Sequence, residues 1–258
     1  MGDSKNLEQR TRAVFIICPG SVAQEESIYL RQYVDGLRQE GYQVYYPPDN
    51  THQADTVGLA ICTQNRTGMK KSREVRIFYN PASEESKFDV GMAFMAEKPF
   101  GIINKDAVVK TASASFENFL LDYEGMYSSA MRADSSLEND GSICMVCPND
   151  VNLSEFGRLD DYAAEMHAYC PEFGAQKPDV TLLDIYTERR DAIRRAKEVH
   201  VFWTGTERDD RFGLGMAFMA EKPILLINRA EVQPTPEKSF NNVLLALDDR
   251  YKNISQNS

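Results

Sequence analysis

The chain alternates between short continuous apolar runs and longer stretches in which apolar residues recur three or four positions apart. Residues 13–18, Ala-Val-Phe-Ile-Ile-Cys, are typical of a parallel strand covered on both faces, because such a strand has no polar side. Further on, Leu30, Val34 and Leu37 have helical spacing, and Gly41 stands where a helix would end. In the first half of the chain this pattern predicts strands at 13–18, 42–46, 75–79 and 100–103, and helices before Gly41 and at 56–72, 86–97 and 115–123.

The second half of the chain repeats the first. Residues 91–99, Gly-Met-Ala-Phe-Met-Ala-Glu-Lys-Pro, recur letter for letter at 215–223, an offset of 215 − 91 = 124. The same offset joins Arg66 to Arg190, and the ungapped register over about sixty residues indicates a tandem duplication. Alternating strands and helices predict a parallel sheet with right-handed crossovers. The expected fold class is therefore α/β, with two tandem Rossmann-like or flavodoxin-like domains, each a small parallel sheet flanked by helices.

The repeat also sets the expected domain boundaries. Repeat one spans residues 1–125 and repeat two spans residues 142–258, and we expect each to be a small domain of its own. Residues 126–141 are rich in Ser, Asp and Asn and are expected to form the linker. The second strand of repeat two gives a weaker pattern, which we place near 180–183.

The charge balance limits the class of partner. The chain has 29 Lys and Arg residues against 39 Asp and Glu residues, a formal net charge of −10. This opposes binding to a nucleic acid duplex or to a membrane surface, which need clustered basic side chains, but it allows a local basic pocket for a small anion. No run approaches the length of a membrane span, and residues 1–12 are polar with no signal-peptide pattern, so we expect a cytoplasmic protein without a membrane partner.

The five cysteines and three histidines do not form a metal-binding pattern. Cys144 and Cys147 have C-x-x-C spacing, but they lie in an apolar run typical of a buried strand, which favours buried thiols over a zinc or redox pair. His52, His167 and His200 are scattered, and His200 alternates with valines as a strand residue does. We therefore expect no metal. P-loop and Gly-x-Gly-x-x-Gly motifs do not occur in the sequence, so neither an ATPase nor a dinucleotide-dependent dehydrogenase is indicated and no cofactor is expected.

Three loops follow the predicted carboxyl ends of strands, and that edge is where open parallel sheets bind ligands. The loops span 18–21, 47–50 and 79–86. The hydroxyl and N–H groups that begin the helix after the third loop could hold a phosphate or a ribose hydroxyl. Alternatively, Ser83 or Ser86 could simply cap that helix.

One arrangement of motifs resembles a known family. A strand of the form Glu-Val-x-x-Phe at 74–78 is followed by Ser-Lys-Phe-Asp-x-Gly-Met-Ala-Phe at 86–94, and then by Lys-Pro at 98–99 before the last strand. This order is similar to that of the nucleoside 2-deoxyribosyltransferases and their relatives, the nucleoside 5′-phosphate N-hydrolases, over nearly the whole of each repeat. The resemblance implies cleavage of the bond between a base and a deoxyribose, with a carboxylate, usually Glu, that attacks C1′.

The resemblance places the attacking carboxylate at Asp89. In the family motif the nucleophile stands two residues before a Gly and about nine before a Lys, which here are Gly91 and Lys98. A second alignment treats Asp89 as an earlier aspartate of the family and puts the nucleophile at Met95, which would make the repeat inert. Asp is one methylene shorter than Glu, so the chain departs from the family at its central residue.

A second departure lies on the preceding helix, where the family has an Asp that contacts the nucleoside. Counting back four positions from Met69 reaches Asn65, which can hydrogen-bond a ribose or a base but cannot act as a base itself. Its neighbour Arg66 could pair with a phosphate or with Asp89, or it could be a solvated helix residue. Tyr79, at the end of the third strand, could stack on a base or pack in the core or an interface.

Repeat two lacks the central carboxylate, because the offset carries Asp89 onto Gly213 and Asn65 onto Arg189. We therefore expect repeat two to lack glycosyl-transfer chemistry. It would either brace repeat one or bind a ligand through Arg189, Arg190 and Trp203.

Three functional hypotheses follow: an enzyme that works from repeat one as a nucleoside deoxyribosyltransferase or nucleotide N-hydrolase, a catalytically inactive nucleotide-binding protein, and a purely structural subunit. The expected partner is a nucleoside or nucleotide. Family members are oligomers whose subunits complete each other's sites, so the resemblance implies a pseudo-twofold pair within this chain and possible further self-association. The candidate catalytic residue is Asp89, and the candidate substrate contacts are Pro19, Gly20, Asp49, Asn65, Arg66, Tyr79, Asn80, Ser83, Ser86 and Gly91.

Overall fold

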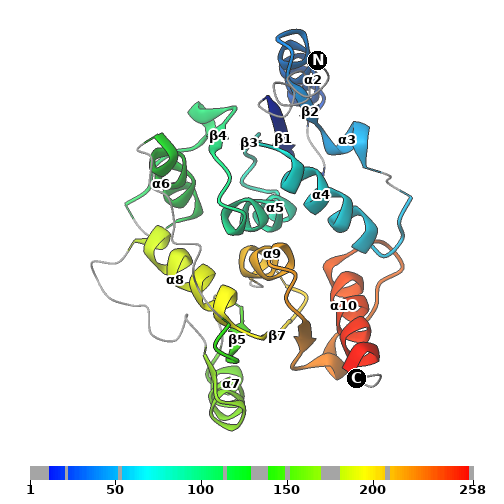
Figure 1. Cartoon of the computed structure of the whole chain (residues 1–258), viewed down its shortest axis with the longest axis vertical. Coiled ribbons are helices and arrows are strands. Elements are labelled where there is room, and N and C mark those ends of the chain that lie inside the picture. Colours follow the sequence, from blue (N-terminus) through cyan, green and yellow to red (C-terminus); the bar gives the residue numbers. More distant parts are fainter. Residues whose placement is uncertain are drawn as a thin grey trace, which may run out of the picture.

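The computed structural model of the chain describes residues 12–20, 23–51, 54–112, 115–128, 139–148, 152–169, 181–206 and 210–255. The strands are β1 (Ala13–Ile17), β2 (Gln43–Tyr45), β3 (Glu74–Ile77), β4 (Phe100–Ile102), β5 (Ile143–Val146), β6 (Ala168–Tyr169), β7 (Glu198–Val201) and β8 (Ile224–Leu226). They form two sheets, each parallel throughout, with the orders β2-β1-β3-β4 and β6-β5-β7-β8 (Figure 1). Helices flank both sheets, so the predicted α/β class with two Rossmann-like units is confirmed.

The helices of the two repeats correspond. Repeat one contains α2 (Gln24–Gln39), the short α3 (Pro47–Asn50), α4 (Leu59–Lys71), α5 (Glu84–Met95), the 3₁₀ turn η1 (Lys105–Ala107) and α6 (Phe116–Ser128). Repeat two contains α7 (Leu153–Met166), α8 (Leu182–Arg195), α9 (Arg211–Met219), the 3₁₀ turn η3 (Arg229–Glu231) and α10 (Phe240–Ser255). Among the residues just described, no helix has the length and apolar character needed to cross a membrane.

Burial on both faces explains why β1 has no polar side. Val14 and Ile16 face one side of the sheet, where they pack with Leu30 of α2. Phe15 and Ile17 face the other side and join the cluster that contains the apolar residues of α4 and α5. Each of these four strand residues is completely buried, so the continuous apolar run is what a central parallel strand requires.

Helices α5 and α9 lie side by side at the centre of the molecule, between the two sheets (Figure 1). Most residues of both helices are buried, which matches helices that are apolar on nearly every side. They touch at their glycines: a Cβ on Gly91 would overlap the main-chain carbonyl of Phe212, and a Cβ on Gly215 would overlap that of Phe88. Because 91 + 124 = 215 and 88 + 124 = 212, the same contact occurs twice, as in a two-fold symmetric interface.

Polar contacts around the helix pair follow the same symmetry. Arg66 of α4 donates to the main-chain oxygen of Phe218 at 3.0 Å and pairs with Glu221 at 3.4 Å. Arg190 of α8, its counterpart in repeat two, pairs with Glu97 at 3.3 Å. Since Glu97 and Glu221 are also related by the offset of 124, the repeats pack as a pseudo-twofold pair.

Each repeat has its own sheet, but the two repeats share a core. One continuous hydrophobic cluster includes Phe88 and Phe94 of α5 together with Phe212 and Phe218 of α9. Only the outer face of each sheet has a separate, smaller cluster, under α2 in repeat one and under α7 in repeat two. The apolar surface of each of these two helices, α5 and α9, is therefore buried partly by its own repeat and partly by the other helix.

The prediction of a strand near 180–183 is wrong. Residue 181 is the N-cap of α8, because the Thr181 hydroxyl oxygen accepts a hydrogen bond from the main-chain N–H of Asp184 at 3.2 Å. The second strand of repeat two is β6, which has only two residues and gives no periodic signal. Strand β2 ends at Tyr45, close to the predicted end of the strand, but residues 47–50, predicted as a loop, form the short helix α3 with Pro47 at its start, where proline is well tolerated.

The other predicted strands and helices are present, with ends shifted by a few residues. Cys144 and Cys147 are buried, and His200 lies within β7, as the sequence predicts. Helix α6 continues to Ser128, into the predicted linker. Residues 129–138 of that linker lie outside the described residues, as does His52.

Candidate functional site

The candidate catalytic carboxylate, Asp89, lies on the part of α5 that faces α4, next to Asn65. The amide oxygen of Asn65 accepts a hydrogen bond from the Thr51 hydroxyl at 2.9 Å, and that hydroxyl lies 3.1 Å from the Tyr45 hydroxyl. Asn65 also hydrogen-bonds the Asp89 side chain. Because the amide oxygen already accepts from Thr51, the amide nitrogen is the group that donates to the carboxylate. Tyr45, Thr51, Asn65 and Asp89 thus form one hydrogen-bonded chain.

The surroundings of Asp89 disfavour its charged form. Burial raises the pKa of Asp89 to about 7, and the negative charge of Glu85, one helical turn earlier, raises it further, whereas the hydrogen bond from Asn65 lowers it. The side chain keeps partial solvent exposure. A carboxyl with a pKa near 7 is present in both protonation states at neutral pH, which suits a group that exchanges protons or attacks an electrophile.

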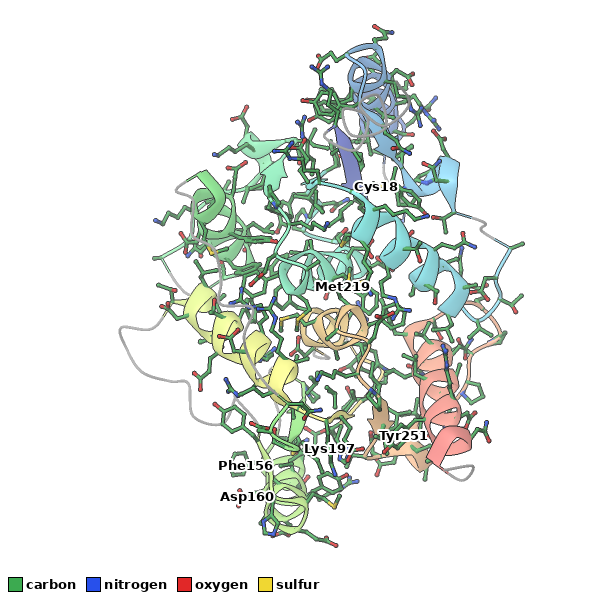
Figure 2. All side chains as sticks on the ribbon, in the orientation of Figure 1. Cys18, Phe156, Asp160, Lys197, Met219 and Tyr251 are labelled. Carbon is green, nitrogen blue, oxygen red and sulfur yellow. The ribbon has the colours of Figure 1, made fainter. Side chains whose placement is uncertain are left out.

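Two thiols stand close to the same carboxylate. Cys18 directly follows β1, where Figure 2 labels it beside α4, and Cys62 belongs to α4. Burial raises the pKa of each thiol to about 12, and the charge of Asp89 adds to the effect. Both cysteines are therefore protonated at neutral pH and are poor nucleophiles.

Several predicted contacts do gather at this carboxyl edge of the sheet. Pro19 is buried and Gly20 is exposed, directly after β1. Asn80 accepts a hydrogen bond from the main-chain N–H of Ala82 at 2.9 Å and shapes the loop before α5. Ser83 and Ser86, at the start of α5, are buried, and their hydroxyl oxygens lie 2.9 Å apart. Ser83 occupies the N-cap position, but its side chain makes no capping bond, so simple capping does not explain it.

Other predicted contacts are engaged elsewhere. Asp49 lies at the outer side of β2 and pairs with Arg31 at 2.6 Å and with Arg38 at 2.8 Å. Arg66 faces α9 and the other repeat, as described above. Gly91 allows the close approach of α9, so its lack of a side chain serves packing between helices.

The aromatic residue at the end of β3 belongs to the core. Tyr79 is 6% exposed, and its hydroxyl donates a hydrogen bond to Glu117 of α6. Its counterpart Trp203 is 2% exposed and donates through Nε1 to Asn241 at 2.8 Å, and Asn241 is the counterpart of Glu117. Of the two alternatives for Tyr79, packing in the core is therefore the one that the structure shows.

In repeat two the equivalent place is filled. Arg189, the counterpart of Asn65, forms an ion pair with Asp210, and both side chains are 2% exposed. Asp210 also accepts a hydrogen bond from the main-chain N–H of Gly213 at 2.7 Å. A side chain at Gly213, the counterpart of Asp89, would overlap Asp210. The arginine and its partner thus occupy the space that the catalytic candidates occupy in repeat one.

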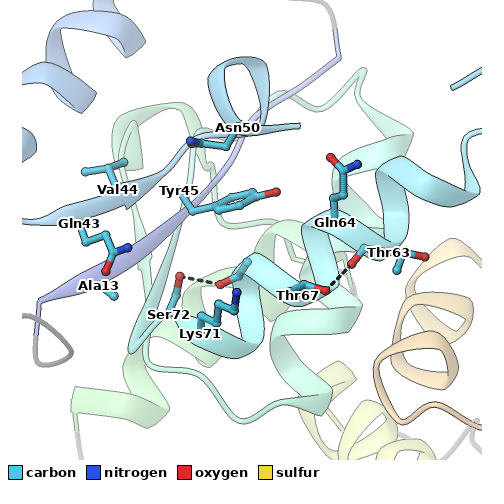
Figure 3. Close-up of a pocket in the computed structure, with 11 residues that line it drawn as sticks. Ala13, Gln43, Val44, Tyr45, Asn50, Thr63, Gln64, Thr67, Lys71 and Ser72 are labelled. Atoms are coloured by element: carbon cyan, nitrogen blue, oxygen red, sulfur yellow. Dashed lines mark hydrogen bonds between the residues drawn. The ribbon is translucent and has the colours of Figure 1, made fainter. Parts of the chain in front are cut away.

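A pocket of about 400 Å³ adjoins the hydrogen-bonded chain of repeat one. It lies between β2 and α4, and the ring of Tyr45 forms part of its wall (Figure 3). Gln43, Asn50, Gln64 and Lys71 supply polar groups around it. Tyr45 lines this pocket and Asp89 does not, so Tyr45 is the link between the pocket and the carboxylate.

Sequence reasoning missed Tyr45 and Thr51. Both lie at the carboxyl end of β2, which is the edge where ligands are expected. Their positions on either side of residues 47–50 were therefore a usable signal, although nothing in the sequence shows that they contact Asn65. Within the described ranges, no group of three or more His, Cys, Asp or Glu side chains is placed to hold a metal ion. Comparisons with protein-family models, curated proteins and solved structures find no significant match.

Proposed function

We propose that repeat one cleaves, or transfers, the N-glycosidic bond of a nucleoside or nucleotide, with Asp89 as the catalytic carboxylate. The observation that carries the proposal is the position of Asp89 at the carboxyl edge of the sheet, hydrogen-bonded to Asn65, with burial raising its pKa to about 7. The resemblance of the surrounding motif to the nucleoside 2-deoxyribosyltransferases suggests the reaction. The filled site of repeat two supports the choice of repeat one as the catalytic copy.

The proposed reaction has two steps. The ionised Asp89 oxygen attacks C1′, the bond between C1′ and the base nitrogen breaks, and the base leaves after taking up a proton. Water or a second base then displaces the carboxylate from C1′, which gives a free sugar or a new nucleoside. Glu85 is one turn from Asp89 on the same face of α5, so a second carboxyl group stands near the reacting bond, as glycosidic chemistry commonly requires.

The decisive experiment measures free base released from a panel of nucleosides, nucleoside monophosphates and NAD-derived nucleotides. We expect Asp89→Ala to reduce the release by at least about 10³-fold, as is usual when a catalytic nucleophile is removed. Asp106→Ala, which changes an exposed Asp of η1, is the matched control and should leave the release unchanged. Equal release by wild type and Asp89→Ala would contradict the proposal.

The pH dependence of the same reaction tests the role of Asn65. Because the hydrogen bond from Asn65 lowers the pKa of Asp89, we expect Asn65→Leu to raise that pKa. The limb of the kcat/KM profile that reports ionisation of Asp89, near pH 7 in the wild type, should then move to higher pH by about half a unit or more. A profile that falls in height without moving would show that Asn65 acts in some other way.

A nucleotide-binding protein without catalysis is the second candidate. The 400 Å³ pocket beside Tyr45 favours it, because that pocket offers amides, hydroxyls and a lysine but no carboxylate. Calorimetric binding of a nucleotide, without base release on prolonged incubation, would favour this reading. In that case Tyr45→Ala should weaken binding, whereas Asp89→Ala should not.

A further inference from the structure

A pocket of about 520 Å³ opens where the two repeats meet, at the C-terminal ends of α4, α5, α8 and α9. Figure 2 labels Met219, one of its residues, between the ribbons of α5 and α9. Every residue of its lining has its counterpart at an offset of 124 also in the lining: Lys70 with Arg194, Met95 with Met219, Ala96 with Ala220, and Lys98 with Lys222. The pocket therefore lies on the pseudo-twofold axis.

The two central lysines of the pocket, Lys98 and Lys222, are each held by two hydrogen bonds, and each keeps one further N–H donor. The ammonium of Lys98 donates to two main-chain carbonyls at the end of α4, at 2.5 and 3.2 Å. The ammonium of Lys222 donates to two carbonyls at the end of α8, at 2.5 and 2.8 Å. An ammonium has three N–H donors, so each lysine keeps one for a ligand. Burial lowers the pKa of both lysines, and a bound anion would offset that cost of desolvation.

The outer cations are held by one carboxylate each. Lys70 pairs with Glu221 at 2.7 Å, and Arg194 pairs with Glu97 at 2.9 Å. Four cations and two carboxylates leave a local formal charge of 4 − 2 = +2, in a chain whose net charge is −10. A small anion is the ligand that this local reversal of charge favours.

We propose that this pocket binds a compact anion with two phosphate groups, one held by each repeat. Each half presents one lysine from the turn after α5 or α9 and one cation from the end of α4 or α8, which is Lys70 in repeat one and Arg194 in repeat two, so the two halves place positive charge at corresponding positions. A diphosphate has matching two-fold symmetry. The volume is within the usual range for small ligands. The site is separate from Asp89, which lies about two turns closer to the N-terminus of α5, so the inference goes beyond the proposed glycosidic activity.

Titration calorimetry of the full chain with inorganic pyrophosphate tests the proposal. We expect one pyrophosphate per chain, with affinity that falls as KCl is raised from 50 to 200 mM, and weaker binding of monophosphate. Lys98→Met and Lys222→Met should each weaken binding by about tenfold, and by similar factors, because the site is symmetric. Lys70→Gln should weaken it without removing any bond to a helix carbonyl.

The matched control is Lys105→Met, which removes an exposed lysine paired with Glu124 at the far edge of repeat one. It should bind pyrophosphate as the wild type does. Circular dichroism of each variant separates loss of the site from loss of the fold, and Lys70→Gln remains informative if the two central variants do not fold. Absence of binding at millimolar pyrophosphate, equal binding of monophosphate, or an equal loss in Lys105→Met would each overturn the proposal.

Discussion

Asp89 shows what a single buried carboxyl costs the fold. Of the two polar side chains that act on its charge, Asn65 stabilises the ionised form and Glu85 opposes it, and burial outweighs both. The folded protein therefore holds a proton at Asp89 that the unfolded chain releases at a pH near the ordinary aspartate value of 3.8. A carboxyl group whose burial destabilises the folded state is common at functional sites, where it is retained for its reactivity.

The stability of an Asp89→Asn variant tests this electrostatic cost. Because the folded-state pKa is raised, wild-type stability should decrease as pH rises from about 4 to about 7, while the variant lacks this contribution. A shift of about three units corresponds to about 4 kcal/mol, so we expect the variant to gain about 2–4 kcal/mol relative to wild type over that interval. Urea unfolding between pH 4 and 8 measures it. A difference that stays constant with pH would mean that the Asp89 pKa is not raised.

The residues of the candidate site were only partly predictable from the sequence. Asp89 and Asn65 could be found because the family motif fixes their spacing along neighbouring elements. Tyr45 and Thr51 could not be connected to Asn65, because their hydrogen bonds join β2, α3 and α4. These contacts depend on the tertiary fold and leave no pattern in the sequence. For Arg66 the sequence left three alternatives open: a phosphate, Asp89 or solvent. The hydrogen bond to Phe218 is none of these, because it depends on how the other repeat packs.

At the scale of elements, the pairing of α5 with α9 gives a physical reason for the identical stretch of nine residues. In a two-fold interface the same surface is used twice, so each helix must suit both its own environment and its counterpart. Gly91 lies against the main-chain carbonyl of Phe212, and Gly215 lies against that of Phe88. Each helix therefore contributes one glycine and one carbonyl to the contact. The identity of these helices thus follows from packing, whereas the flanking positions at Asp89 and Gly213 are free to differ.

Alanine substitutions at the glycines test this close approach. Gly91→Ala and Gly215→Ala would each place a methyl group against a main-chain carbonyl that cannot move aside without separating the helices, so we expect losses of about 2 kcal/mol or more. Gly36→Ala in α2 and Gly157→Ala in α7 are the controls, because nothing lies within 4 Å of the added Cβ. These should be neutral or stabilise by up to about 1 kcal/mol. Thermal unfolding of all four variants compares them, and equal effects would contradict the close contact.

Element types were predictable wherever a strand or helix was long enough to show its period. The continuous apolar run of β1 and the amphipathic helix around Leu30 carry strong patterns. The two-residue strand β6 carries none, and the apolar pair Leu182 and Leu183 at the start of α8 resembles a strand until the capping Thr181 is taken into account. Short elements therefore depend on tertiary pairing, which sequence periodicity does not report.

At the scale of the whole molecule, the shared core makes the two repeats dependent on each other. The rings of Phe94 and Phe212 lie 5.8 Å apart, and those of Phe88 and Phe218 lie 5.6 Å apart, so the same aromatic contact joins the two repeats at two symmetry-related places. Separation would expose both helices and the cations that pair with Glu97 and Glu221. Among the described residues, the outer clusters under α2 and α7 are small in comparison, with eight and four buried members.

Dividing the chain between α6 and β5 tests this dependence. Each half alone should be poorly folded or should self-associate through its exposed helix, α5 or α9, because the apolar surface of that helix has lost its partner. Co-expressed halves should instead form a one-to-one complex, since the isologous contacts at Gly91 and Gly215 and the ion pairs around them need no covalent link. Glu97→Lys, which turns the pairs with Arg190 and Arg194 into repulsions, should weaken that complex. Size-exclusion chromatography with light scattering distinguishes these states. Two folded, monomeric halves that do not bind each other would show that the interface contributes little to the stability of the fold.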